Sequence, residues 1–455
     1  MESRLDRLET EQTTKLFWEY SIPAIVGSLV VAIYNTIDSI YIGHGPGLGD
    51  HAIGGLGIVL PIMTLLTALG LFVGTGAASR ISIYMGMGLK DEAERVLGNA
   101  FLLVVLLTGI SILFIYLFLE SILLAIGATN ETYHFAREFL LYYLPCNLFL
   151  NLSYTLSSIM RASGYPKKAM YTMLVGVITN ILLAPVFIFI LEWGMKGAAI
   201  ATSISTLVTL IPIMYHFWDK NSTLRFYKNK ISLDKKIIWA IVSIGFSPFI
   251  MQLAASVVVF FINNRLSIYG DSIAIEAYTI ASRLTLVIIL IIVGLTQGMQ
   301  PIVGYNFGAK RFDRVASTVN QAIKAGIGIG IVGLICGIFF SNIIVRPFNP
   351  SEALADEAAR ALKILTIMLP LSGLQMVISN FFQSVGMPVK SVLLSLTRQF
   401  LILVPSLFIL SYFFGLDGVW ASIPISDFLS TVLAVALYIW QIRKFNKKTY
   451  AVTLT

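Results

Sequence analysis

The chain has 455 residues, of which 57% are apolar and 12% are charged, and its formal net charge is +8. Soluble globular proteins carry roughly 25% charged residues, so this chain has too little polar surface to cover a water-soluble particle. Its composition excludes a cytosolic enzyme and a disordered chain. Two cysteines, Cys146 and Cys336, both inside apolar runs, exclude a disulfide framework and a cysteine-built metal site. The composition predicts a polytopic membrane protein.

Twelve apolar runs long enough to cross a bilayer as helices follow one another along the chain. They cover residues 20–37, 52–79, 96–119, 139–160, 169–191, 197–218, 237–264, 284–309, 325–345, 364–389, 399–416 and 418–442. The first extends to about Tyr41 past Asp38, and the last contains Asp427. Strands of an outer-membrane barrel are about half as long and alternate in polarity. We therefore predict an all-α membrane protein with twelve transmembrane helices.

Most of the 32 Lys and Arg residues fall in the N-terminal segment, in every second loop and in the C-terminal segment. Cytoplasmic loops carry such an excess of basic residues. The pattern predicts a multi-pass protein of the plasma (inner) membrane with both termini in the cytoplasm. The basic charge then faces membrane lipids, and no nucleic-acid partner is expected.

The two halves of the chain repeat each other. Local matches occur in the same order and at a nearly constant separation: Pro23 with Pro248, Pro145 with Pro370, 163–168 with 385–390, Pro185 with Pro405, and 194–199 with 415–420. Each half holds six runs, an even number, so the repeats are parallel and related by a pseudo-two-fold axis along the membrane normal. We predict an N-terminal lobe over 1–218, a cytoplasmic linker over 219–236 and a C-terminal lobe over 237–455.

No motif of an enzyme is found. The chain lacks a phosphate-binding G-x-x-x-x-G-K-[ST] loop, and its four histidines show no H-E-x-x-H spacing. One G-x-G-x-x-G match, 328–333, lies wholly inside an apolar run with no strand before it, so it indicates close helix packing. We expect no enzymatic activity and no cofactor.

Asp38 is the first ionisable residue inside a run, where a charge is costly and usually faces water or a partner. Helical spacing places Tyr34 and Asn35 on its face. The residue is a candidate proton site or Na⁺ site; the alternative is solvation near the outer mouth. The repeat pairs Asp38 with Asn263, so the two halves differ in charge at this position.

Depth along the runs places Asn180 and Thr202 with Asp38 in the outer half of the N-terminal lobe. Their oxygens suit a hard cation, although ordinary interhelical hydrogen bonds explain them equally well. In the C-terminal half, Arg398 and Asp427 either form an ion pair or line a cavity. The polar residues expected around a substrate cavity are Tyr34, Asn35, Gln252, Asn263, Gln297, Arg398 and Asp427.

Several stretches together resemble the multidrug and toxic compound extrusion (MATE) transporters, in the branch that contains the MepA-type and DNA-damage-inducible exporters. They are IPAIVGSLVVAIYNTIDSIYIGH, ASGYPKKAM, TNILLAPVFIF, GAAIATSIS, QGMQPIVGYNFGAKRFDRV and SLTRQFLILVPSLFIL. The resemblance implies twelve helices in two six-helix lobes. It also implies export of organic, often cationic, compounds in exchange for Na⁺ or H⁺, with a coupling site in the N-terminal lobe.

The resemblance assigns site residues one by one. Asp38 matches the family's acid in span one, Asn180 its Asn in span five, and Thr202 its Thr in span six. Ala184 stands where span five usually carries an acid, and Ser256 stands where some relatives carry one in span seven. A site with one carboxylate holds Na⁺ weakly, which favours H⁺ slightly over Na⁺.

These observations predict a secondary multidrug efflux antiporter that works by alternating access, as a monomer in lipid, on small organic substrates. An alternative is a flippase for lipid-linked precursors or oligosaccharides on a related two-lobe scaffold. That cargo is anionic, and only Arg398 is basic deep inside a run. An intramembrane enzyme would need paired catalytic groups at one depth.

Overall fold

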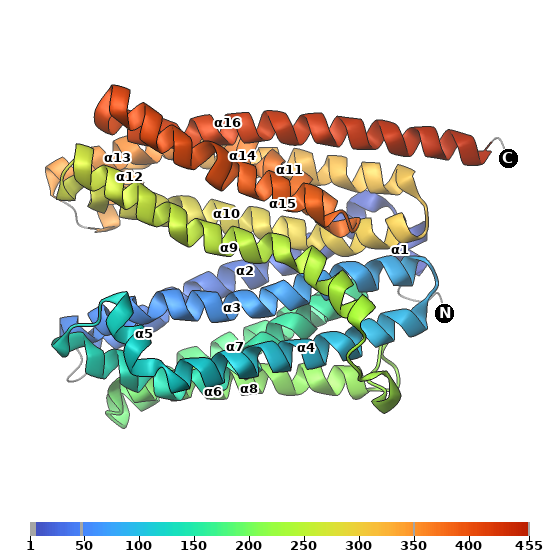
Figure 1. The fold of residues 1–455 in the computed structure, drawn as a ribbon, viewed down its shortest axis with the longest axis horizontal. Coiled ribbons are helices and arrows are strands. Elements are labelled where there is room, and N and C mark those ends of the chain that lie inside the picture. Colours follow the sequence, from blue (N-terminus) through green and yellow to red (C-terminus); the bar gives the residue numbers. More distant parts are fainter. Residues whose placement is uncertain (1–5, 46–48, 349–350, 454–455) are drawn as a thin grey trace. The chain divides into compact units, whose positions relative to one another are not determined.

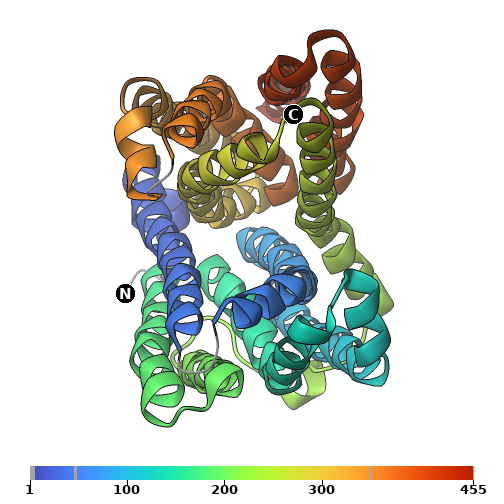
Figure 2. The same ribbon diagram turned by 90° about the vertical axis from the view of Figure 1, so that its left-hand side faces the viewer.

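The computed structural model describes residues 6–45, 49–348 and 351–453, and within these ranges every regular element is a helix. Long helices run roughly parallel or antiparallel to one another within each unit of the chain (Figures 1 and 2). In chain order the elements of the N-terminal half are α1 Asp6–Thr10, α2 Thr13–His44, α3 Gly49–Gly86, α4 Lys90–Leu117, α5 Leu119–Ile126, α6 Asn130–Ala162, α7 Pro166–Pro185, η1 Val186–Ile190, α8 Gly194–Trp218 and η2 Lys228–Lys230.

The second half follows the same plan. Its elements are α9 Lys235–Tyr269, α10 Ser272–Gly308, α11 Phe312–Phe339, α12 Ser341–Val345, η3 Arg346–Phe348, α13 Glu352–Thr366, α14 Leu369–Ser384, α15 Pro388–Leu396, η4 Thr397–Leu403 and α16 Val404–Thr453. Both η1 and η4 are π-helical segments beside a proline of the repeat, Pro185 and Pro405.

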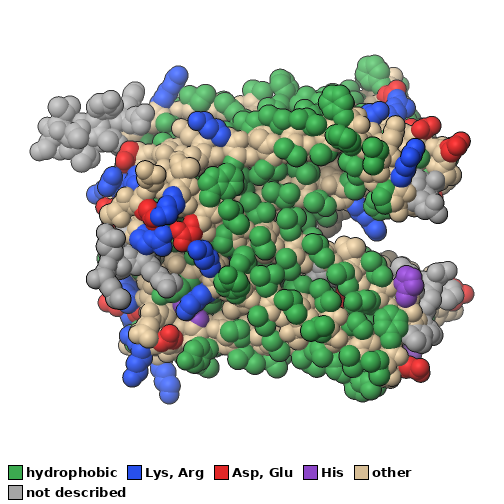
Figure 3. Space-filling view, turned by 180° about the vertical axis from the view of Figure 1, so that it is seen from behind, with side chains coloured by type: hydrophobic (Ala, Val, Ile, Leu, Met, Phe, Trp, Pro, Cys, Tyr) green, Lys and Arg blue, Asp and Glu red, His purple; other side chains and the backbone are tan. Residues whose placement is uncertain are grey.

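Twelve spans are present, as the sequence predicts. Within the described ranges nine helices are long and apolar enough to cross a membrane, or ten with the pair α13 and α14, which bends by 46°. The run Pro388–Phe445 is counted once but turns back at Gly415, whose φ of 57° few other residues adopt. The long helix α6 has 33 residues, enough to cross a bilayer, and is more polar than these helices. Apolar side chains cover the middle of the helices on the face in Figure 3.

The chain divides into two compact units, Met1–Ile25 with Ile250–Thr455, and Val26–Phe249. We call them the C-terminal unit and the N-terminal unit. Their boundaries fall inside α2 and α9, next to Pro23 and Pro248, and differ from the predicted lobes 1–218 and 237–455. Because proline removes a helical hydrogen bond, each helix is able to change direction there and pack its two parts in different units.

Glycines explain how the first part of α9 packs in the N-terminal unit. A Cβ on Gly76 of α3 would lie 2.1 Å from the carbonyl oxygen of Ile241, and a Cβ on Gly245 would lie 1.8 Å from that of Phe72. No side chain larger than hydrogen fits at such distances. The backbones of α3 and α9 therefore touch, as small residues allow in membrane proteins.

The C-terminal unit repeats this contact with the first part of α2. A Cβ on Gly298 of α10 would lie 2.4 Å from the Cα of Ser21, and a Cβ on Gly294 would lie 2.5 Å from that of Ile25. The internal repeat of the sequence is thus visible as the same packing of a half-helix in each unit.

Polar contacts outside the spans secure both half-helices at their ends. In the C-terminal unit, Arg314 and Asn306 each donate a hydrogen bond to the carbonyl oxygen of Leu8. In the N-terminal unit, Lys230 lies 2.7 Å from a carboxylate oxygen of Asp91 and 2.6 Å from one of Glu94. The linker is therefore docked on the start of α4.

Candidate functional site

Asp38 lies in α2 within the N-terminal unit, where it is half-buried. Its Oδ1 atom is fully buried and has no hydrogen-bond partner among the described residues. The side chains of Tyr34 and Asn35, which helical spacing places on the same face, lie outside the described residues. Burying a carboxylate oxygen without a hydrogen bond is costly inside a membrane-spanning helix, which keeps Asp38 as the candidate coupling residue of this unit.

Two contacts fix the height of Asp38 against the neighbouring helix. A Cβ on Gly27 would lie 3.5 Å from Sδ of Met173 in α7, and the rings of Tyr41 and Phe189 lie 6.1 Å apart. Both contacts join α2 to α7–η1 in the same chain order, and Asp38 lies between Gly27 and Tyr41 in α2, so its level is between Met173 and Phe189. The predicted partner Asn180 is in the same interval of α7.

Asn180 is buried and bridges α7 to α8. Its Nδ2 donates to Oγ1 of Thr202 at 3.3 Å and to Oγ of Ser205 at 3.4 Å, and Thr202 donates to the carbonyl oxygen of Ala198. The structure thus brings Asn180 and Thr202 together and adds Ser205, which sequence reasoning missed. Its spacing from Thr202, one helical turn, is the signal that could have found it.

Ala184 is fully buried in an apolar cluster of the N-terminal unit that also contains Ile42, Ile188, Ala198 and Ala201. Within the described residues no group of three or more His, Cys, Asp or Glu side chains could hold a metal ion.

Arg398 and Asp427 form a direct ion pair in the C-terminal unit, with Nε and Oδ1 2.7 Å apart. Ser372 of α14 donates to the other oxygen, Oδ2, at 2.5 Å. The sequence left an ion pair and a cavity lining open for these two residues. The ends of the apolar runs do not give the offset of the two helices, because α15 begins before its run and α16 continues beyond its run to Thr453.

The structure places three other polar residues predicted around a cavity on two helices of the C-terminal unit. Gln252 and Asn263 lie on α9 and Gln297 lies on α10, and all three are half-buried. Oδ1 of Asn263 is buried without a partner among the described residues, like Oδ1 of its repeat counterpart Asp38.

A polar network inside the N-terminal unit was not anticipated. Asn151 of α6 accepts a hydrogen bond from the backbone of Gly70 and donates to the carbonyl of Leu66, to Thr108 and to Asn147. It therefore joins α3, α4 and α6. Asparagines within the apolar run 139–160 were a signal for it.

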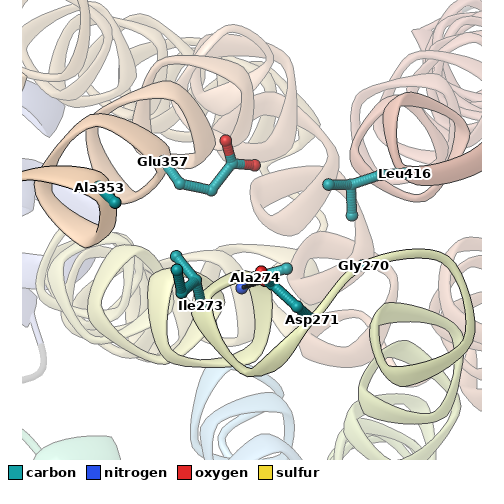
Figure 4. Close-up of a pocket in the computed structure, with 7 residues that line it drawn as sticks. All are labelled: Gly270, Asp271, Ile273, Ala274, Ala353, Glu357 and Leu416. Carbon is teal, nitrogen blue, oxygen red and sulfur yellow. Dashed lines mark hydrogen bonds between the residues drawn. The ribbon is translucent and has the colours of Figure 1, made fainter.

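A shallow pocket of about 350 Å³ opens at one end of the C-terminal unit, lined by Gly270, Asp271, Ile273, Ala274, Ala353, Glu357 and Leu416 (Figure 4). Both of its carboxylates have structural tasks. Asp271 caps α10 by accepting from the backbone of Ala274, and Glu357 accepts from Nε1 of Trp420. We do not assign the transport site to this pocket.

Comparisons with known proteins agree with this architecture. The MatE family model matches residues 23–186 and 248–409, one segment in each half of the chain. The multidrug export protein MepA of Staphylococcus aureus is 30% identical over 443 residues, covering 96% of each chain. The protein of the same name from Staphylococcus haemolyticus is 29% identical over 439 residues, covering 95% of each.

Solved structures show the same fold. A crystal structure of MATE in the bent conformation has a TM-score of 0.92 at 25% identity, covering 98% of this chain and 99% of that one. The outward-facing conformation of a multidrug resistance MATE family transporter of the MOP superfamily has a TM-score of 0.91 at 25% identity, covering 96% and 98%. This chain is therefore a multi-pass membrane protein and belongs to the MATE family, as its motifs indicate.

Proposed function

We propose that the protein exports small organic, often cationic, compounds in exchange for H⁺ or Na⁺ by alternating access. It works in the plasma (inner) membrane as a monomer with both termini in the cytoplasm, and it needs no cofactor or enzymatic step. Membership of the MATE family and the MepA relatives support the export activity. The observation that carries the coupling is the buried Oδ1 of Asp38, which has no partner among the described residues.

The coupling mechanism follows from the cost of that carboxylate. A buried carboxylate without a counter-charge is stabilised when it takes up a proton or a cation. Polar oxygens are available in the same unit from Asn180 on α7 and from Thr202 and Ser205 on α8. Ion and cargo drive exchange only if each favours a different conformation of the transporter.

The identity of the ion depends on the number of charges at the site. With Ala184 buried in an apolar cluster, Asp38 is the one carboxylate that we assign to the site in the N-terminal unit. Na⁺ loses its hydration shell on binding and prefers several oxygen ligands, whereas a proton needs one carboxylate. We therefore favour H⁺ slightly over Na⁺.

Transport in proteoliposomes tests this function. The purified protein is reconstituted, and efflux of the organic cation ethidium is followed under an imposed pH gradient or Na⁺ gradient. The wild type should accelerate efflux under one gradient, and Asp38→Asn should reduce that acceleration to the passive leak. Asp417→Asn serves as the matched control, because Asp417 is exposed and paired with Arg360 far from the coupling site in sequence. Gradient-driven efflux by the Asp38→Asn variant at the wild-type rate would refute the role of Asp38.

A further inference from the structure

Arg398 lies in the π-helical segment η4, between α15 and α16 in the C-terminal unit. Such π-helical turns are frequent at functional sites. Its Nε donates to Oδ1 of Asp427, and Ser426 donates to its backbone carbonyl. Ser372 holds the second carboxylate oxygen of Asp427. The bond from Nε to Asp427 therefore orients the guanidinium of Arg398, and the bond from Ser372 holds that carboxylate in place.

The rest of the guanidinium is uncommitted. No hydrogen bond joins its two terminal nitrogens to any residue that the structure describes. The Arg398 side chain is 21% exposed, whereas that of Asp427 is 7% exposed. On either side of Arg398 in η4, Oγ1 of Thr397 and Oε1 of Gln399 are buried without partners among the described residues. Asp427 is therefore buried behind a partly exposed guanidinium whose two terminal nitrogens have no partner among the described residues.

The internal repeat allows the surroundings of Arg398 to be compared with the matching part of the N-terminal unit. The match of 194–199 with 415–420 pairs Ser205 with Ser426, and the match of Pro185 with Pro405 pairs Asn180 with Phe400, two residues after Arg398. In the N-terminal unit Asn180 bonds Ser205; in the C-terminal unit Arg398 bonds Ser426 through its carbonyl. The C-terminal unit therefore carries a charged pair, Arg398 and Asp427, in the region where the N-terminal unit carries the neutral polar groups Asn180 and Ser205.

We propose that Arg398 is a specificity-determining residue that binds a carboxylate of the transported compound through its two terminal nitrogens, Nη1 and Nη2. This inference rests on the proposed export function and deepens it. Two parallel N–H groups match the two oxygens of a carboxylate, and such charge-assisted pairs are among the stronger hydrogen bonds in proteins.

Asp427 narrows the class of compound further. Since Asp427 pairs with Arg398, the pair leaves no lone charge inside the membrane and offers no net positive charge to an anion. A carboxylate is accepted there only if the compound supplies its own positive charge. The cargo class that fits is a zwitterion, an amphipathic compound with both a cationic group and a carboxylate.

The probes are rhodamine B, which carries a fixed cationic charge and a carboxylate, and its ethyl ester, which keeps the cation and lacks the carboxylate. Binding of each dye to the purified full-length protein in detergent is measured by fluorescence anisotropy. Arg398→Lys keeps the positive charge but lacks the two parallel N–H groups of the guanidinium. In this variant the ratio of the affinity for rhodamine B to the affinity for its ester should fall at least about tenfold. The double variant Arg398→Met with Asp427→Asn should show the same fall without leaving a lone charge in the membrane.

The control is Arg360→Lys, which changes an ion-paired, half-exposed arginine near the end of the same unit and should leave the ratio unchanged. Melting temperatures confirm that each variant is folded. An unchanged ratio in a folded Arg398 variant, or an equal loss of both dyes, overturns the inference and leaves the export function standing. If the wild type shows no gradient-driven ethidium efflux, the export function itself is overturned.

Discussion

The buried ionisable residues of this protein are of two kinds: those with an ion-pair or hydrogen-bond partner and those without one among the described residues. Lys230 in the linker belongs to the first kind, because it bridges Asp91 and Glu94. Asp38 belongs to the second kind, because its Oδ1 has no partner in the part of the chain that the structure describes. Glu94 is 3% exposed at its side chain, and its other oxygen has no partner among the described residues. The linker is therefore held by a contact whose loss leaves a buried carboxylate behind.

We predict that Lys230→Gln loosens the linker and destabilises the N-terminal unit by about 1–3 kcal/mol, the cost of leaving a buried charged group unpaired. Trypsin cleavage within 219–236 should become faster, and hydrogen exchange there should increase. Lys228→Gln, in the same short helix η2, is the matched control and should leave both unchanged. Equal cleavage rates in Lys230→Gln and the wild type would mean that the salt bridges do not hold the linker.

The pH dependence of this contact has a definite sign. Hydrogen bonds to Asp91 and then to Glu94 raise the pKa of Lys230 above its ordinary value of 10.5. A group whose pKa is raised by folding stabilises the folded state fully below its unfolded pKa, and that stabilisation is lost as the pH rises through the folded pKa. The linker should therefore stay protected from trypsin up to about pH 10.5 and lose protection above it. A loss of protection between pH 7 and pH 9 would contradict this assignment.

At the scale of elements, the packing of helices through glycine decides which helix parts belong together. Gly76 on α3 and Gly298 on α10 each face the backbone of a half-helix at less than the distance a methyl group allows. Gly57, also on α3, has no atom within 4 Å of an added Cβ. Two glycines of one helix thus have opposite expected responses to the same substitution.

We predict that Gly76→Ala lowers the free energy of unfolding by about 1–3 kcal/mol, because the methyl group pushes α9 away from α3. Gly57→Ala should instead be neutral or stabilising by up to about 1 kcal/mol, because alanine favours the helix. Thermal unfolding in one detergent compares the two. A melting temperature of Gly76→Ala equal to or above that of Gly57→Ala would show that α3 and α9 do not touch at this point.

The sequence predicts most elements well and their bends poorly. Apolar runs locate all twelve spans, because a bilayer requires long runs whatever the neighbours are. The bend between α13 and α14 and the π-helical segments depend on packing, so the runs 364–389 and 399–416 do not show them.

The candidate site was also partly predictable. The free-energy cost of an ionisable side chain inside the membrane is enough to identify Asp38, Arg398 and Asp427 as candidate site residues, since such residues are rare inside spans. Whether two of them pair depends on how helices are offset along the bundle, which no run length gives. The structure supplies this offset for Arg398 and Asp427.

At the scale of the whole molecule, α2 and α9 each pass from one unit into the other. Any rearrangement of one unit relative to the other must therefore bend these two helices between the glycine contacts and the rest of the span. Pro23 and Pro248 lie at the two crossings. A proline within a helix lacks one backbone hydrogen bond, which lowers the resistance to bending at that point.

We predict that Pro248→Ala slows gradient-driven ethidium efflux without weakening ethidium binding, because the restored hydrogen bond stiffens α9 where it must bend. Alanine also has a higher helix propensity than the proline that it replaces, so the melting temperature should stay equal or rise. Pro212→Ala in α8 is the matched control, since this helix lies entirely within the N-terminal unit and crosses no boundary. Efflux by Pro248→Ala that matches Pro212→Ala and the wild type would show that α9 does not bend at Pro248 during transport. A joint loss of binding and efflux in Pro248→Ala would instead indicate a packing role for the proline ring.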